Sequence, residues 1–341
     1  MIDFRYHLVS IVAVFLALAI GIVLGSTELQ GPVYSALSHT TNVLQNKLSN
    51  ADTQWNAAQN SLNADTAYLT ATEAWDVRGM LNGQRVVVFT EPGYQPSVLS
   101  GIETALKDAG ATVTGQLNLQ QKFFDSSNAT AASLEATNSQ LASDDNISLD
   151  SGLSSQQAAT AQVLAAEILT KSSASGAGIQ TASNAQSTQA QGAIGAYAAQ
   201  NYLTMSGAPG TQATLAVLVT PQTTPSDGTA DPLAQVLGPF AAELANGSSG
   251  TVVAGSAAGS GAGSPIAELR ATSAKQVSSV DDADTVSGDM SVVAALYSTL
   301  TGGNAVAYGS IVGTYPSLNP TVTPSPSSTP SSSSSSRKPH K

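Results

Sequence analysis

The chain has 341 residues, of which 10% are charged, and its 12 Lys and Arg against 23 Asp and Glu give a net charge of −11. An acidic chain with few, scattered basic residues lacks the positive surface of a nucleic-acid-binding protein, so we expect no nucleic-acid partner. Cysteine is absent, which excludes disulfides and cysteine nucleophiles. His7, His39 and His340 lie outside the central region, so no Ser-His-Asp triad or histidine-held zinc is expected there. We therefore predict a protein that is not an enzyme and needs neither a cofactor nor a bound metal.

The N-terminal segment, residues 1–27, is predicted to be a transmembrane anchor. An uncharged apolar run extends from Leu8 to Gly25 and spans roughly 27 Å as a helix, close to the thickness of the bilayer core. Arg5 precedes the run and no Lys or Arg follows until Lys47, which predicts a cytoplasmic N-terminus and an extracytoplasmic main domain. A cleavable signal peptide is the alternative, but no A-x-A site follows the run. The residues that we assign to the anchor are Leu8, Val14, Phe15, Leu18, Gly21 and Gly25.

Residues 28–78 are predicted to form a helical stalk with a weak heptad pattern. Apolar residues recur at spacings of four and three, which is typical of a coiled coil and predicts a homo-oligomer or a hetero-complex. Thr41 and Asp65 interrupt the pattern. A single amphipathic helix packed on its own domain is an equal alternative. The predicted seam consists of Leu37, Leu44, Leu48, Trp55, Leu62 and Leu69.

Residues 79–314 are predicted to form a Rossmann-like α/β domain. Arg85–Thr90 is a short β-branched run, Ser97–Ala109 has helical spacing, and Thr112–Leu119 is a second apolar run, which together predict a βαβ unit. Alternation of strands and helices favours a parallel sheet that is covered on both faces. Later strands are expected at Thr214–Thr220, Thr251–Ala254 and Gln276–Val280, with helices at Asp231–Ala245 and Ser287–Leu300.

Two further regions differ in composition from the sheet domain. Residues 125–207 are rich in Ala, Gln, Ser and Thr and are interpreted as a helical insertion, with helices at Ser155–Thr170 and Gln186–Met205. Residues 315–341 contain repeated prolines and a six-serine run and are predicted to be a disordered tail. A Ser/Thr/Pro tail outside the cytoplasm is also a hypothetical site of O-glycosylation, which the intact mass of the native tail would test.

The chemistry-bearing groups of the domain are mostly carboxylates. Asp281, Asp282 and Asp284 lie where a predicted strand meets a helix, and Glu91 follows the first predicted strand. Parallel sheets place ligand sites at the carboxyl ends of their strands, so these four residues are a possible ligand or partner face, or the site of carboxylate chemistry. The alternative is that they serve helix capping and turns. A calcium loop would need Glu where Val293 stands.

The glycine-rich and methionine residues give weaker signals. The run Gly255–Ser264 has the outline of a dinucleotide-binding loop but lacks the G-x-G-x-x-G spacing. Copper(I) prefers Cys and Met ligands, and no two of the four methionines are close in sequence, so no sequence-local copper site is expected.

The N-terminus Phe4-Arg5-Tyr6-His7-Leu8-Val9-Ser10 and the segment Ser278–Gly288 resemble the actinobacterial copper-transport family MctB. The order of anchor, stalk, RVVVFT strand and Pro/Ser tail is also similar to this family. The resemblance implies a non-enzymatic role in copper homeostasis or efflux, and copper is a partner only on this ground. Some relatives, of the SteB type, are described as cell-division factors that help to control peptidoglycan hydrolysis at the septum, which is the alternative function.

A pore-forming role is not what the sequence favours. An outer-membrane barrel needs many strands of about ten residues with alternating lipid-facing and lumen-facing side chains. This chain instead alternates helices with short strands, and one apolar helix cannot line a channel unless several copies assemble. An anchored, oligomerising envelope protein fits the pattern better.

Overall fold

A computed structural model describes residues 4–171, 186–222, 232–273 and 275–316. The chain divides into two compact units, residues 1–68 and residues 69–341. The second unit begins ten residues before the α/β domain that the sequence predicts, because it includes the last turns of the long N-terminal helix. The predicted tail lies outside the described residues except for Tyr315 and Pro316.

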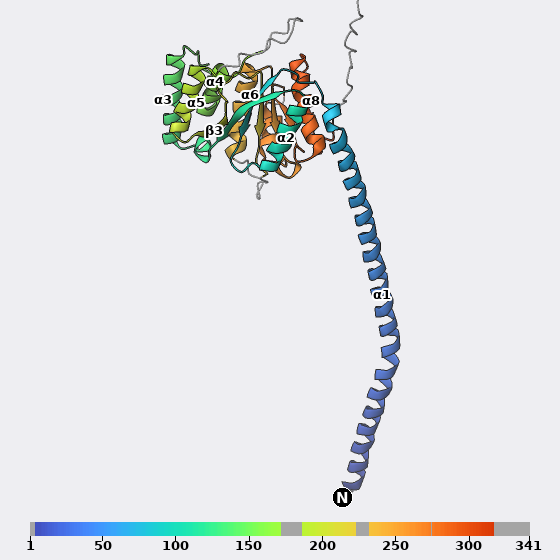
Figure 1. Ribbon diagram of the computed structural model, residues 1–341. Coiled ribbons are helices and arrows are strands. Elements are labelled where there is room, and N and C mark those ends of the chain that lie inside the picture. Colours follow the sequence, from blue (N-terminus) through green and yellow to red (C-terminus); the bar gives the residue numbers. More distant parts are fainter. Residues whose placement is uncertain (1–3, 172–185, 223–231, 274, 317–341) are drawn as a thin grey trace, which may run out of the picture. The chain divides into compact units, whose positions relative to one another are not determined.

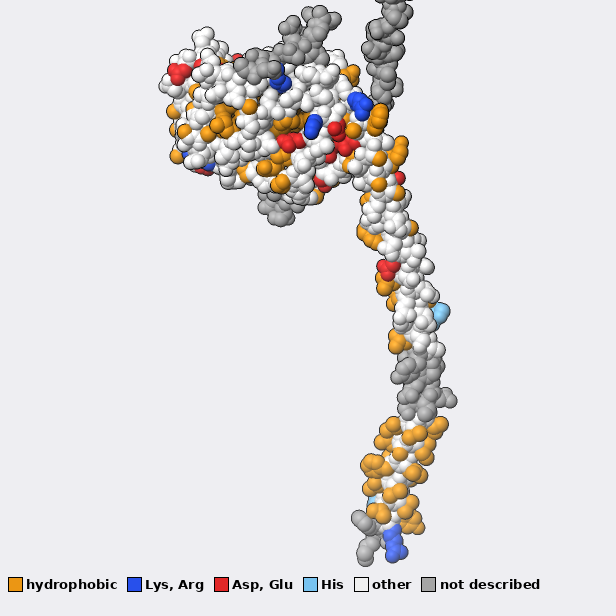
Figure 2. Space-filling model, viewed as in Figure 1, with side chains coloured by type: hydrophobic (Ala, Val, Ile, Leu, Met, Phe, Trp, Pro, Cys, Tyr) orange, Lys and Arg blue, Asp and Glu red, His pale blue; other side chains and the backbone are white. Residues whose placement is uncertain are grey.

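The first unit is helical throughout its described part. Helix α1 (Phe4–Asp76) is continuous over 73 residues, so the apolar run and the polar stalk belong to one helix. Its segment Arg5–Gly25 has a mean hydropathy of 2.9, none of it is buried, and it is long and apolar enough to cross a membrane. Figure 2 shows hydrophobic side chains over the visible face of this segment and sparser ones farther along the helix.

The second unit contains a seven-stranded sheet with the order β3-β2-β1-β4-β5-β6-β7. The strands are β1 (Arg85–Thr90), β2 (Thr112–Leu119), β3 (Leu203–Gly207), β4 (Leu215–Val219), β5 (Gly250–Ala254), β6 (Ser278–Val280) and β7 (Ala307–Tyr308). All neighbouring pairs are parallel except β2 and β3. The predicted parallel-sheet domain is therefore confirmed. The central strands are buried on both faces, as their continuous runs of Val, Leu and Ala indicate.

Helices cover both faces of this sheet (Figure 1). One face packs against α2 (Pro96–Asp108) and α8 (Val286–Leu300). The other face packs against a larger set of helices and against the short helix η1 (Gln121–Phe124). That set consists of α3 (Asn128–Asp144), α4 (Gln156–Ile168), α5 (Thr188–Ala199), α6 (Pro232–Gly247) and α7 (Pro265–Thr272). Three phenylalanine rings form the centre of this second core: Phe240 meets Phe89 and Phe123 edge to face, with ring centroids 5.7 and 5.5 Å apart.

The structure differs from the prediction between α5 and β3. A helix was expected over Gln186–Met205, but α5 ends at Ala199 and the chain then enters an antiparallel edge strand. Asn201 has a φ of 60°, in the left-handed region that Asn tolerates better than most residues and that is typical of the end of a helix. The sequence analysis also did not foresee α3 or the short strand β7.

Candidate functional site

The carboxyl ends of the parallel strands form one edge of the sheet, and the strand order reverses there between β1 and β4. β1 continues to β2 on one side, whereas β4 begins the series β4-β5-β6 on the other. Open α/β sheets bind ligands at such a switch point. Glu91 follows β1 at this edge, is 1% exposed, and its N–H donates to the Val219 carbonyl at the end of β4 (3.0 Å).

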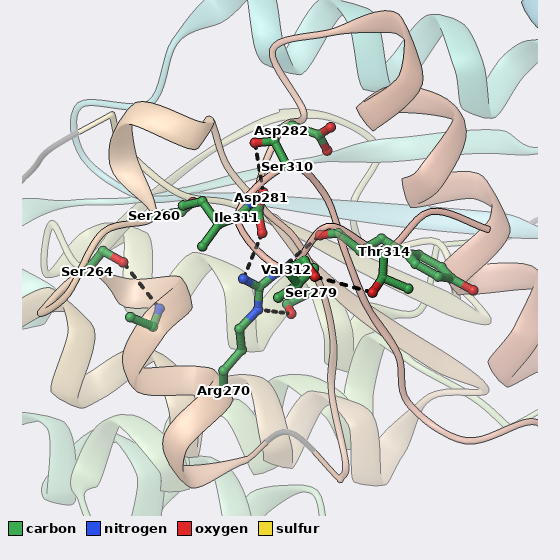
Figure 3. A network of polar contacts seen from close by, with 12 residues as sticks. Ser260, Ser264, Arg270, Ser279, Asp281, Asp282, Ser310, Ile311, Val312 and Thr314 are labelled. Atoms are coloured by element: carbon green, nitrogen blue, oxygen red, sulfur yellow. Dashed lines mark hydrogen bonds and ion pairs between the residues drawn. The ribbon is translucent and has the colours of Figure 1, made fainter.

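Asp281 directly follows β6 and is fully buried in a network that Figure 3 shows. Its Oδ2 pairs with Nη1 of Arg270 at 2.7 Å, and its Oδ1 accepts a hydrogen bond from the Ile311 N–H at 3.0 Å. Arg270 also donates from Nε to Ser279 Oγ (2.8 Å) and from Nη2 to the Tyr308 carbonyl (3.1 Å). Asp281 and Arg270 together therefore connect α7, β6, β7 and the segment that follows β7.

Asp282 is 3% exposed and accepts a hydrogen bond at Oδ2 from the Tyr315 hydroxyl (2.9 Å). Burial raises the pKa of Asp282, and the neighbouring carboxylates Asp281 and Asp284 raise it further. Its Oδ1 is buried with no hydrogen-bond partner among the described residues. Asp284 is exposed. The four predicted carboxylates therefore lie near the same edge of the sheet, but only Asp284 is open to solvent.

The residue of this segment whose side chain caps α8 is a threonine and not one of the aspartates. The N-cap of α8 is Thr285, whose Oγ1 accepts a hydrogen bond from the Gly288 N–H at 3.1 Å. Asp282 contributes its backbone carbonyl, which accepts from the Thr285 N–H (2.9 Å) and from Oγ1 of Thr285 (2.8 Å).

Asp289, in the first turn of α8, is a largely buried acid next to this edge. It is 8% exposed and lies directly over Gly101 of α2, where a Cβ atom would collide with its carboxylate. Burial raises the pKa of Asp289 to about 8, and the charges of Glu73, Asp282 and Asp284 add to the effect. Burial also raises the pKa of Glu73, near the end of α1, and nearby Asp108 raises it further. The sequence places Asp289 beside the predicted face, but nothing in it indicates the approach of Glu73.

Backbone amides of the glycine-rich loop Gly255–Ser264 donate hydrogen bonds within the loop itself. The Gly259 N–H bonds to Ser256, and the Ser264 N–H bonds to the Gly261 carbonyl. Gly259 also lies so close to the Pro221 carbonyl that a Cβ atom would be 2.8 Å from it. The loop is therefore packed against the chain after β4, and these amides are not directed at a phosphate.

Metal-binding groups are dispersed in the described part of the chain. In residues 4–171, 186–222, 232–273 and 275–316, no group of three or more His, Asp or Glu is placed to hold a metal ion. Met205 is exposed in β3, Met290 is buried in α8, and Met80 lies between α1 and β1.

The residues assigned to the anchor and the stalk lie on α1. The large apolar side chains of the anchor are exposed, and nothing lies within 4 Å of the Cβ position of Gly21 or Gly25. In the seam, Leu69 is partly buried and belongs to the second unit. The other seam residues are 58–66% exposed: Leu37, Leu44, Leu48, Trp55 and Leu62.

Comparison with known proteins gives one consistent result. The chain matches the family described as "Copper transport outer membrane protein, MctB" over residues 1–316. It is 27% identical over 314 residues to "Copper transporter MctB" of Mycobacterium tuberculosis (strain ATCC 25618 / H37Rv), an alignment that covers 91% of this chain and 96% of the relative. A relative of the same name from Mycobacterium leprae (strain TN) is 28% identical over 313 residues, with the same coverage. Since the match includes the apolar helix, the stalk and the whole described part of the α/β domain, the chain belongs to the MctB family.

Proposed function

We propose that this chain is a membrane-anchored envelope protein with a non-enzymatic role in copper homeostasis, in particular in copper efflux. The observation that carries the proposal is the family match over residues 1–316, together with relatives that are named copper transporters. The exposed apolar segment Arg5–Gly25 supports the membrane location.

The proposed topology follows from the distribution of charge. Arg5 lies at the N-terminal end of the apolar segment, and the next Lys or Arg is Lys47, far along the stalk. The positive-inside rule then places the N-terminus in the cytoplasm and the stalk and α/β domain outside it. In this orientation the uncleaved helix α1 carries the domain on the outer side of the membrane.

The proposed role acts through assembly rather than through a metal cage built by one chain. Large apolar side chains are exposed along the stalk of α1, where they are suited to associate with another helix. In the α/β domain, the carboxylate of Asp281 is already paired with Arg270, and that of Asp282 accepts from Tyr315. The stalk is therefore the proposed coiled-coil segment through which the chain joins a homo-oligomer or a hetero-complex.

The proposal is tested by cell-associated copper in a deletion strain and its parent during copper load. We expect more copper in the deletion strain and a return to the parental level when the intact gene is restored. A matched control restores a gene without residues 5–25, which should be expressed but should not lower the copper content. Equal copper in parent and deletion strain would contradict the proposal.

A second candidate function is a division-site scaffold that binds a partner and helps to control peptidoglycan hydrolysis. The exposed seam of α1 favours it, because a partner-binding stalk needs no metal ligand. The same strains distinguish the two functions. Unchanged copper with defective septa would support the scaffold, whereas raised copper with normal septa would support efflux.

A further inference from the structure

We propose that the stalk of α1 pairs with a second copy of this chain as a parallel, in-register, two-stranded coiled coil. This deepens the assembly part of the proposed function by naming the partner and the geometry. Its test measures association in the absence of copper, so its failure would leave the copper test untouched.

The stalk carries a heptad pattern along one side of α1, which is exposed from Leu37 to Asp65 and ends at the partly buried Leu69. Large apolar groups occupy most core positions, with Thr41 and Asp65 as the polar exceptions. The a positions are Thr41, Leu48, Trp55, Leu62 and Leu69, and the d positions are Leu37, Leu44, Ala51, Ala58 and Asp65. The opposite face is polar, with Asn46, Thr53 and Asn60 at successive f positions, all exposed.

The sizes of the core residues fit a close pairing of two such helices. Trp55, the largest residue of the pattern, is 66% exposed in the single chain. Ala51 precedes it by four residues and Ala58 follows it by three, so both neighbouring d layers are small. Cores pack well when large and small side chains alternate between facing layers. Two copies of Trp55 would therefore fill the room that the two alanine layers leave.

The charges of the stalk match a parallel register. Lys47 is the only Lys or Arg between Arg5 and Arg78, and it occupies a g position. Asp52 occupies the e position five residues later, which is where a parallel dimer places the partner of a g residue. Two symmetric pairs, Lys47 with Asp52 of the second copy and the reverse, form only in this register. Within one helix, residues five apart do not face each other.

The anchor leads to the same orientation. If the apolar segment Arg5–Gly25 enters the membrane in one direction, two copies in that membrane present their stalks side by side with the same polarity. A second copy in the parallel register therefore covers the exposed apolar seam. It also packs Trp55 between the alanine layers and pairs Lys47 with Asp52 of the other chain.

Disulfide trapping in the full-length protein tests the register, because the native chain has no cysteine. Leu44→Cys and Ala58→Cys each place a thiol at a d position, and facing core positions lie near the Cα separation of about 4.4–6.8 Å that a disulfide needs. Asn46→Cys and Asn60→Cys are the matched f controls, on the far sides of two helices of about 10–12 Å diameter. In membranes with a mild oxidant, we expect both d variants to form covalent dimers and both controls to remain largely monomeric.

The two d positions are fourteen residues, or about 21 Å, apart along the helix. An antiparallel pair can bring a residue to its own copy only near the symmetry axis, so it cannot trap both positions. Trapping at only one d position, or equal trapping at d and f positions, would overturn the proposal. A full-length protein that sediments as a monomer in mild detergent would also overturn it.

A charge exchange provides the second measurement, and it leaves the apolar seam intact. Lys47→Asp puts two like-charged pairs in the dimer and should weaken association severalfold, as should Asp52→Lys. The double variant, Lys47→Asp with Asp52→Lys, restores opposite charges and should recover most of the affinity. A double variant that associates no better than either single variant would contradict the parallel register.

Discussion

The two units of the chain place the same kind of side chain in opposite surroundings. In the α/β unit, Phe89, Phe123 and Phe240 are at most 1% exposed, and the Phe240 ring contacts the other two. In α1, Trp55 and the large apolar residues of the anchor are more than half exposed. The α/β unit therefore completes its core within one chain, whereas the apolar surface of α1 is left exposed in the single chain, as in a surface that contacts lipid or another protein. Single substitutions should act on folding in the second unit and on association in the first.

The largest expected effect is the loss of the aromatic core. Phe240→Ala should lower the free energy of unfolding of the α/β unit by about 3–5 kcal/mol, because it removes a buried ring and leaves a cavity. Trp55→Ala is the matched truncation on α1 and should change this free energy by less than about 0.5 kcal/mol. Chemical denaturation of both variants, followed by circular dichroism at a wavelength for β structure, checks the difference. Similar losses in the two variants would show that the two regions do not differ as described.

The next effect concerns the buried ion pair. Arg270→Met should cost about 3 kcal/mol, since Asp281 would remain buried without its cationic partner. Lys275 is exposed and lies between α7 and β6. The control Lys275→Met removes its charge and should change stability by less than about 0.5 kcal/mol. Thermal unfolding at pH 7 gives the comparison. Equal stability of the two variants would mean that the network around Asp281 does not hold the C-terminal strands in place.

Asp289 gives the α/β unit a pH dependence of defined sign. Its pKa in the folded state is raised to about 8, so the folded protein binds more protons than the unfolded chain between about pH 4 and pH 8. Its contribution to stability therefore falls as the pH rises through that window and levels off above pH 8. Asp289→Asn removes this penalty and should stabilise the protein by about 1–3 kcal/mol at pH 9, with little change at pH 4.

The control for Asp289 is Glu135→Gln, which neutralises an exposed carboxylate on α3. It should leave the pH dependence of unfolding close to that of the native chain. If Asp289→Asn and Glu135→Gln have the same pH profile, Asp289 is ionised in the folded protein at neutral pH and the proposed penalty is absent.

The smallest effect is expected in the stalk. Asp65 occupies a d position of the proposed dimer, where a carboxylate packs poorly against its own copy. Asp65→Leu should tighten self-association about fivefold, whereas Asn63→Leu, at an outer b position, should not change it. Analytical ultracentrifugation of the full-length variants in detergent measures both. Weaker association of Asp65→Leu would contradict the assignment of this position to the core.

The sequence predicts the sheet well because its strands are short apolar runs between clear turn residues. Arg85–Thr90 and Thr112–Leu119 coincide with β1 and β2, since each run is bounded by Gly, Pro or polar residues. The edge strand Leu203–Gly207 escaped prediction because Leu-Thr-Met-Ser-Gly has only two apolar residues and is separated by only three residues from the end of an Ala-rich helix. Its only local signal is Asn201, whose positive φ ends the helix.

The candidate site was predictable in its position but not in its contacts. The carboxylates after β1 and β6 follow from the rule for parallel sheets. The partners Arg270, Glu73 and Tyr315 come from other elements, and only the folded chain brings them to this edge. The seam stays a prediction from spacing alone, because a heptad is a local pattern and the single chain shows no partner helix on it.

Site-specific labelling tests the proposed topology, with the stalk outside the cytoplasm, most directly. In the chain without native cysteines, Asn60→Cys places one thiol on the outer face of the stalk. A membrane-impermeant maleimide should label this variant in intact spheroplasts as strongly as after lysis, with the labelled chain recovered at full length in the membrane fraction. Labelling only after lysis would place the stalk in the cytoplasm and contradict the proposed topology.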